Sequence, residues 1–326
     1  MMHKLNNIKS KYKTRIAIIG FILLFAFRNY ANCQVNVTNI KIKIKDTSGS
    51  ISHGFCGWPS MRARWSEIYA DSSYYPVPKV KYSASIFADS TEFSKRRSVA
   101  EEILQNMVYL PAGSFWQGCT LEEDIECDHR AFAEKPLHKK DVTGFFMGST
   151  EITQRQWRKV MGYNPSLNKG CEDCPVESIS WNEVQGFLSI LNACTGLQFR
   201  LPSETEWEYA AKMADSTSTW KKGDTLALKN IGWYYVNSEG KTHPVGTKEQ
   251  SCTGLYDMHG NVREWCSDLY GLYPKKKKEF IPMESGWRSV RGGSYSDEFR
   301  KCRSSYRFYQ HPGEKSEFVG FRVVLN

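Results

Sequence analysis

The sequence predicts an α+β fold with little regular secondary structure, and three observations favour this class. Segments with helix-capping signals follow one another between residues 153 and 212, whereas runs with strand character are few and short. Beyond residue 213 the helical period disappears, and turns and isolated aromatic residues follow. Aromatic residues make up 13% of the chain, which is typical of a loop-rich fold with a core of large flat side chains.

Short apolar runs predict the strands of this fold. They cover Met107–Leu110, Val142–Met147 and Phe321–Leu325. The first of them is closed by a Pro-Ala-Gly turn. Loops as long as those between these runs are usually functional or need to be stabilised. Bound cations and disulfide bonds are the two means of stabilisation available here.

Capping signals predict three helices. Ser or Thr at the first position and Glu three residues later form a capping box, and glycine marks the end of a helix. The starts are Thr153, the pair Ser180 and Glu183, and the pair Ser203 and Glu206, with stops at Gly162 and Gly196. The first helix is expected to end at Met161.

The N-terminus has the composition of a secretory signal over residues 1–33. A basic segment precedes the apolar run Ile16–Phe27, and Ala-Asn-Cys ends at Cys33. Cleavage after Cys33, lipidation of Cys33 and an uncleaved anchor are the three alternatives, and all of them predict export. Residues 34–105 are expected to form an N-terminal β-rich extension or arm, because Val35–Lys45 alternates between apolar and polar residues.

The formal net charge of +9 does not indicate a nucleic-acid partner. Six basic residues in the first 33, which contain no Asp or Glu, account for six of these charges and leave +3. The remaining basic run, Lys275–Lys278, is expected to be a solvated loop.

Nine of the ten cysteines lie beyond Cys33, and an exported chain is expected to form disulfides. The simplest local pairs are Cys119 with Cys127 and Cys171 with Cys174. Zinc at the second pair is the alternative, but no further pair lies at matching spacing. An odd number leaves at least one thiol free, paired to another chain or chemically employed.

The stretch Gly254–Asp268 has the composition of a cation-binding loop. Asp257, Asn261 and Glu264 offer side-chain oxygens within eight residues, and glycines permit unusual backbone conformations. A glycine-bearing turn between two core elements is the alternative.

Several blocks occur in one order that resembles the formylglycine-generating enzyme family, also called sulfatase-modifying factors. They are Met107–Phe115 (MVYLPAGSF), Glu151–Thr153 (EIT), Phe199–Ala210 (FRLPSETEWEYA), Gly254–Trp265 (GLYDMHGNVREW), Arg291–Tyr295 (RGGSY) and Gly320–Arg322 (GFR). The resemblance covers residues 106–326. It implies a variant of the C-type-lectin-like fold and, in the family's enzymes, copper-dependent oxidation of a sulfatase cysteine to formylglycine.

The resemblance places the two copper-binding cysteines of the family at Asp297 and Cys302. Cu(I) prefers two soft thiolates, so copper is not expected here. Ser294 matches a serine of the active-site cleft, which makes Ser294, Asp297 and Cys302 the candidate catalytic residues. Cys266 is expected to form a disulfide with Cys302, and a catalytic Cys302 thiol is the alternative.

The resemblance also implies structural calcium. One ion would be bound by the side chains of Asp257 and Glu264 and by the carbonyls of Gly260 and Val262. A second would use Asn230 and the carbonyl of Ile231, although the loop with its remaining ligands is shorter here. Arg263 stands where the family has tryptophan.

Three functions are compatible with these residues. The first is an exported, calcium-stabilised binding or structural component of the cell envelope, with a protein or envelope partner. The second is an oxidoreductase or other enzyme that modifies a protein cysteine, and the third is a carbohydrate- or peptide-binding module. Membrane contact is expected only through an anchor or a lipid at the N-terminus.

Overall fold

A computed structural model describes residues 90–119, 131–215, 225–273, 281–282 and 286–326. The predicted signal segment, the extension up to residue 89, the lysine run and Cys127 lie outside these residues. Within the described ranges, no helix is long and apolar enough to cross a bilayer.

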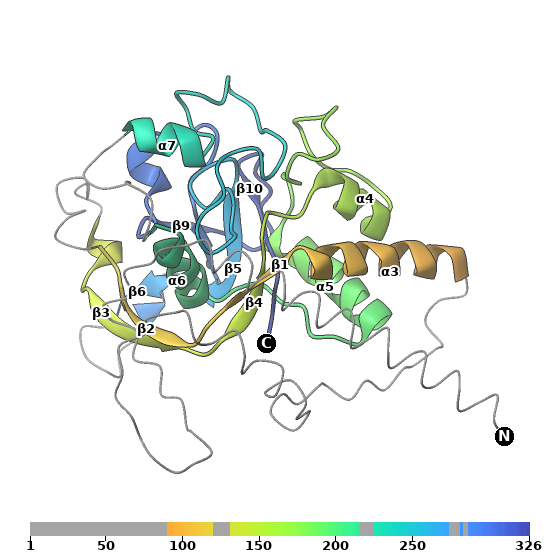
Figure 1. Cartoon of the computed structure of the whole chain (residues 1–326), viewed down its shortest axis with the longest axis horizontal. Helices are drawn as coiled ribbons and strands as arrows, with labels where there is room; N and C mark the ends of the chain where they lie inside the picture. Colours follow the sequence, from red (N-terminus) through yellow and green to blue (C-terminus); the bar gives the residue numbers. More distant parts are fainter. Residues whose placement is uncertain (1–89, 120–130, 216–224, 274–280, 283–285) are drawn as a thin grey trace, which may run out of the picture. The chain divides into compact units, whose positions relative to one another are not determined.

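The fold is α+β, as predicted (Figure 1). The helices are α3 (Ser90–Gln105), α4 (Gln154–Met161), α5 (Trp181–Thr195), α6 (Glu204–Asp215) and α7 (Thr225–Ile231), with short 3-10 turns η2 (Ala131–Glu134) and η3 (Phe299–Cys302). The strands are β1 (Met107–Leu110), β2 (Gly113–Gln117), β3 (His138–Val142), β4 (Phe145–Gly148), β5 (Arg263–Leu269), β6 (Gly271–Leu272), β7 (Ile281–Pro282), β8 (Arg288–Arg291), β9 (Arg307–Gln310), β10 (Val319–Gly320) and β11 (Val324–Leu325).

Two small sheets organise the domain. One has the order β1-β4-β11 and is antiparallel. The other has the order β10-β5-β8-β9, in which β10 runs parallel to β5. The last two strands therefore join different sheets: β10 pairs with β5 in the four-stranded sheet, and β11 pairs with β4 in the three-stranded sheet.

The helix predicted from Thr153 is confirmed as α4, with both halves of its capping box. The Thr153 hydroxyl accepts a hydrogen bond from the Gln156 amide, and the Gln156 side chain accepts one from the Thr153 amide. Gly162 ends the helix in the left-handed conformation. The helices that begin after Ser180 and Ser203 have the same reciprocal bonds and are also confirmed.

Thr153→Ala is expected to lower the free energy of unfolding by about 1 kcal/mol, because the Gln156 amide loses its acceptor. Urea unfolding measures this change. Ser98→Ala on the exposed face of α3 is the control and should change the free energy by less than about 0.5 kcal/mol. Equal losses in both variants would contradict the capping role.

The structure differs from the predicted elements at four places. The run Phe321–Leu325, predicted to be one strand, forms a strand only at its end, in β11 (Val324–Leu325). Helix α3 covers part of the segment expected to be an extension, and Val99, Ala100 and Ile103 on it are buried in the main core. The run Val142–Met147 is interrupted at residues 143–144, so that it belongs to two strands, β3 and β4. Helix α7 lies in the region where the helical period disappears.

The larger core forms around Trp157 on α4. Its ring stacks on Phe187 with a centroid distance of 5.3 Å and meets the edge of Phe321 at 6.0 Å. Helix α3 packs against α4 and α5 over this core (Figure 1). A second core lies around Trp207 on α6 and includes Met147 and Val324 of the first sheet.

Candidate functional site

The three candidate catalytic residues lie together, in the turn after β8 and at the end of η3. The Ser294 hydroxyl donates a hydrogen bond of 2.8 Å to Asp297 Oδ2. Gly293 has φ +74°, and a Cβ atom there would lie 2.7 Å from Cys302 Sγ, so the turn passes directly over the thiol. Ser294, Asp297 and Cys302 are all buried.

Arg263 holds the Asp297 carboxylate in a two-point ion pair. Its Nε donates to Oδ2 at 2.8 Å and its Nη2 to Oδ1 at 2.6 Å. The guanidinium lies 4.0 Å from the centroid of the Phe308 ring. Lys301 adds a longer contact of 3.5 Å to the same carboxylate. Asp297 is therefore a fixed, charge-compensated group.

The predicted disulfide between Cys266 and Cys302 is wrong, because both residues carry free thiols. Their side chains belong to different hydrophobic clusters. Cys266 packs in the core around Trp207, and Cys302 packs with Leu228 and Tyr234. Burial, and secondly the charge of Asp297, raise the pKa of the Cys302 thiol well above its ordinary value. A buried, protonated thiol also does not match a catalytic thiol that faces a cleft.

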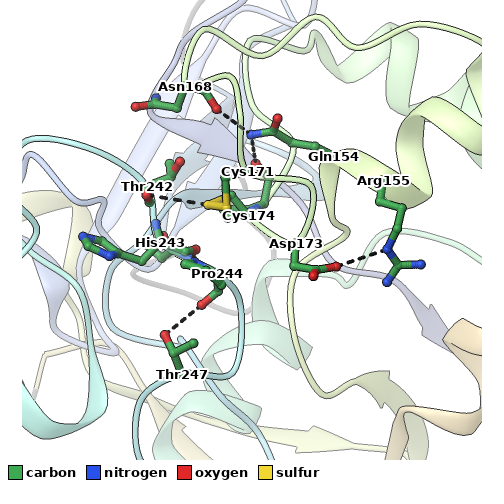
Figure 2. Close-up of a disulfide and its surroundings, with 12 residues drawn as sticks. Gln154, Arg155, Asn168, Cys171, Asp173, Cys174, Thr242, His243, Pro244 and Thr247 are labelled. Carbon is green, nitrogen blue, oxygen red and sulfur yellow. Dashed lines mark hydrogen bonds and ion pairs between the residues drawn. A yellow bond between two sulfur atoms is a disulfide. The ribbon is translucent and has the colours of Figure 1, made fainter.

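The predicted disulfide between Cys171 and Cys174 is confirmed (Figure 2). Cys174 Sγ lies 3.7 Å from the carbonyl oxygen of Thr242, and the Val245 amide donates to the Asp173 carbonyl at 2.9 Å. The bridged loop therefore supports the neighbouring segment 242–247. Cys119 is also disulfide-bonded.

Glu264 on β5 has its carboxylate engaged from several sides. Arg322 donates to both oxygens at 2.7 Å, and Trp207 Nε1 donates to Oε2 at 2.7 Å. All three side chains are completely buried. The carboxylate thus holds the Arg322 guanidinium and the Trp207 indole together in the core.

Asp257 is 2% exposed and has a left-handed backbone with φ +58°. Its Oδ2 accepts a hydrogen bond of 2.7 Å from the Gly246 amide, while Oδ1 has no donor among the described residues. Burial raises its pKa to about 6. Glu151 lies beside it and is 1% exposed, and burial followed by the charge of Asp257 raises the pKa of Glu151 well above its ordinary value.

The second candidate ion position lies at the end of α7. The Asn230 carbonyl accepts a hydrogen bond of 2.9 Å from the Glu249 amide. Ile231 lines a cavity of about 120 Å³ that Asp257 and His259 also line. One residue of each candidate ion position, Ile231 and Asp257, therefore lines the same cavity.

A family model described as "Sulfatase-modifying factor enzyme 1-like domain" matches residues 92–326. The chain belongs to this family. The formylglycine-generating enzyme of Mus musculus is 31% identical over 68% of this chain and 76% of the mouse protein. "Chaperone protein LppX" of Paenibacillus barcinonensis is 27% identical over 51% of this chain and 75% of that protein. In three chlamydial relatives named serine/threonine-protein kinase, the match spans 40–44% of their own length.

Treponema denticola variable protein 1 is a similar solved structure, with a TM-score of 0.57 and 26% identity. The match covers 67% of this chain and 94% of that chain. Together with the family match, it confirms the expected variant of the C-type-lectin-like fold. The family match begins within α3, which agrees with the packing of that helix into the core.

The residues at the family's copper position do not fit Cu(I). A linear copper site needs two thiolates, and this position offers one buried protonated thiol and one carboxylate bound by Arg263. Arg263 and Asp297, where the resemblance implies tryptophan and cysteine in the family, are in direct contact. Each compensates the charge of the other.

The residues at the first calcium position of the family fit an ion only in part. Asp257 offers an unpartnered oxygen, but Glu264 is engaged by Arg322 and Trp207. In the described part of the chain, no three His, Cys, Asp or Glu side chains converge on a metal position. Gly260 is confined by the Trp233 carbonyl, since a Cβ atom would lie 2.1 Å from its oxygen. Calcium bound here would neutralise buried carboxylates and hold the loop together.

Two residues that shape this region receive no role from the sequence, namely Glu151 and Arg322. Both lie in blocks that carry the family resemblance, the EIT and GFR blocks. Membership in these two blocks was the only sequence signal that could have marked Glu151 and Arg322 as site residues. Their partners lie 106 and 58 residues away in the sequence, at Asp257 and Glu264 respectively, and local patterns do not reveal such contacts.

Proposed function

We propose that this chain is an exported, calcium-stabilised binding or structural component of the cell envelope that does not perform the copper-dependent oxidation of its family. The Arg263–Asp297 ion pair at the copper position carries this proposal. Export rests on the composition of residues 1–33.

The chemistry of Asp297 and Cys302 supports the absence of copper-dependent oxidation activity. Asp297 is a hard oxygen donor whose charge is compensated by Arg263 and Lys301. Cys302 would have to lose a proton in a buried site beside the Asp297 carboxylate, and burial above all raises its pKa and opposes thiolate formation. Neither group offers the soft ligand that Cu(I) requires.

A protein partner is the favoured ligand class, and the surface beside the ion pair supports it. The Tyr235 amide donates to the Asp297 carbonyl at 3.0 Å, which places the exposed side chains of Tyr235 and Val236 next to the former copper position. Lys301 is also partly exposed there. One relative is named a chaperone protein, which agrees with a function in binding other proteins.

The second candidate function is oxidation of a protein cysteine to formylglycine. It is supported by the relative of Mus musculus that is named formylglycine-generating enzyme, at 31% identity. Under this alternative, Asp297 or another residue would replace the missing copper ligand.

The mature protein is expected to bind well under one Cu(I) ion per chain and to leave a Cys-x-Pro-x-Arg peptide unmodified, because it lacks a second thiolate. Titration with a Cu(I) indicator and mass spectrometry of the peptide under oxygen measure both properties. Formylglycine produced by the wild-type chain would overturn the proposal.

The double variant Arg263→Trp/Asp297→Cys is the matched comparison, because it restores both family residues. It is expected to bind about one Cu(I) ion per chain. Asp297→Cys alone leaves the Arg263 guanidinium without its counter-charge and is expected to bind more weakly. If the double variant binds no more Cu(I) than the wild type, the Arg263–Asp297 pair is not the cause of the missing copper affinity.

A further inference from the structure

The disulfide between Cys171 and Cys174 has one accessible end and one buried end. Cys171 is partly exposed, whereas Cys174 is 1% exposed. Lys169, Gly170 and Glu172, which flank Cys171, are all exposed. An incoming thiolate therefore reaches the bridge from the side of Cys171. Because this loop lies open on the surface, a segment of another protein can approach it as well as a small thiol.

The backbone holds the bridged loop without help from its sulfur atoms. The amides of Gln154 and Arg155, in the first turn of α4, donate to the carbonyls of Cys174 and Glu172 at 2.9 Å. A disulfide stabilises a fold more when it closes a longer loop, and this one joins residues only three positions apart. Stabilisation of the fold is therefore a weak reason for this bridge, and the loop can keep its shape when the bridge opens.

The charges around the loop are compatible with a thiolate. Glu172 and Asp173 lie between the two cysteines, and as uncompensated carboxylates they would oppose a second negative charge. Arg158 Nη2 donates to Glu172 at 2.7 Å, and Arg155 Nε donates to Asp173 at 3.1 Å. Both arginines belong to α4, whose N-terminus faces the loop, and the positive end of a helix favours a thiolate.

Cys174 has a hydrogen-bond acceptor in place for its reduced form. Its Sγ lies 3.7 Å from the carbonyl oxygen of Thr242 (Figure 2). A disulfide sulfur carries no hydrogen, but the reduced thiol can donate to this carbonyl. The Val245 amide donates to the Asp173 carbonyl at 2.9 Å, which keeps the segment with Thr242 beside the loop. The reduced pair therefore gains a contact that the oxidised pair lacks.

We propose that Cys171 and Cys174 exchange their disulfide with cysteine thiols of protein partners. The thiolate of a partner cysteine attacks Cys171 Sγ and forms a mixed disulfide. The bond to Cys174 breaks, and Cys174 Sγ receives the electron pair and then a proton from water. A second partner thiolate attacks the partner's own sulfur in the mixed disulfide and releases Cys171 as a thiolate. The partner is thereby oxidised to a disulfide, and the chain is reduced by two electrons.

The reverse exchange with another disulfide compound restores the bridge. This activity adds a reaction to the proposed binding function. It does not depend on the absence of copper chemistry, because the groups that carry it lie on a different loop from Asp297 and Cys302.

The first experiment mixes the oxidised mature protein with a synthetic peptide that carries two reduced cysteines. Rapid alkylation and mass spectrometry are expected to show peptide disulfide, up to one per chain, and new thiols at Cys171 and Cys174. The peptide should be oxidised at least about 10-fold faster than without the protein. The disulfide of the buried Cys119 is the internal control and should stay intact. Circular dichroism of the reduced chain should match that of the oxidised chain, because the backbone contacts of the loop remain.

Two single variants test the unequal roles of the cysteines. Each is incubated with the disulfide-linked dimer of a peptide that has one cysteine. Cys174→Ser is expected to capture one peptide at Cys171. Cys171→Ser also lacks the bridge, but it should capture peptide at Cys174 at least about 10-fold more slowly, because Cys174 is buried. Cys252→Ser removes another partly exposed thiol and should keep the exchange rate of wild type.

Several outcomes would overturn the assignment. They are a wild-type chain that leaves the two-cysteine peptide reduced, equal capture by the two single variants, and a chain that unfolds when its Cys171–Cys174 bridge is reduced. Exchange with reduced glutathione but not with the peptide would refute a protein partner as the substrate. If the cysteine variants do not fold, the experiment on wild type decides alone.

Discussion

Arg322→Met is expected to lower the free energy of unfolding by about 3–5 kcal/mol. The substitution removes the guanidinium that pairs with Glu264 and leaves that carboxylate buried without a counter-charge. Three backbone carbonyls lose their donor at the same time. Methionine is unbranched and fills much of the space, so the loss reports charge and hydrogen bonds more than volume. Urea unfolding followed by tryptophan fluorescence measures the change.

Arg158→Met provides the control, because its ion pair has the same length in a different environment. Arg158 lies 2.7 Å from Glu172, as Arg322 does from Glu264, but the two side chains are 52% and 48% exposed. Solvent screens such a pair, and the expected loss is about 0–1 kcal/mol. Similar losses in the two arginine variants would show that burial does not decide the contribution of Arg322.

Trp157→Ala is expected to cost about 3–5 kcal/mol of unfolding free energy. The indole is completely buried and contacts Phe187 and Phe321, which come from α5 and from the C-terminal segment. Removing it opens a cavity that three separate elements would have to close. The midpoint and slope of urea unfolding together measure this loss.

Trp116→Ala on β2 removes the same atoms from the surface. Trp116 is 56% exposed, so this substitution is expected to cost less than about 1 kcal/mol. If Trp116→Ala were as damaging as Trp157→Ala, the core around Trp157 would not be the main source of stability.

Local signals predicted the parts of the fold that depend on neighbours in sequence. Thr153 and Ser180 bond to residues three positions later, so their helices can be read from short motifs. Helix α7 has seven residues and no comparable motif. Val99, Ala100 and Ile103 pack helix α3 against α4 and α5. Adjacent basic and acidic residues in the same segment make this narrow apolar face hard to recognise in the sequence.

In the candidate site too, local contacts could be predicted from the sequence and long-range contacts could not. The sequence brought Ser294, Asp297 and Cys302 together, because they lie within one turn and a short helix. It did not reveal that Arg263 pairs with Asp297, because these residues meet through packing between distant segments. The expected Cys266–Cys302 bridge is wrong for a similar reason, since sequence does not show which core a cysteine enters.

The C-terminal segment has a consequence for how the chain is made. Residues 319–325 add a strand to each sheet, and Phe321 and Val324 enter different cores. Arg322 between them neutralises Glu264. During synthesis from the N-terminus, neither core can close until this segment has left the ribosome. Both cores are therefore completed only after nearly all of the described domain has been made.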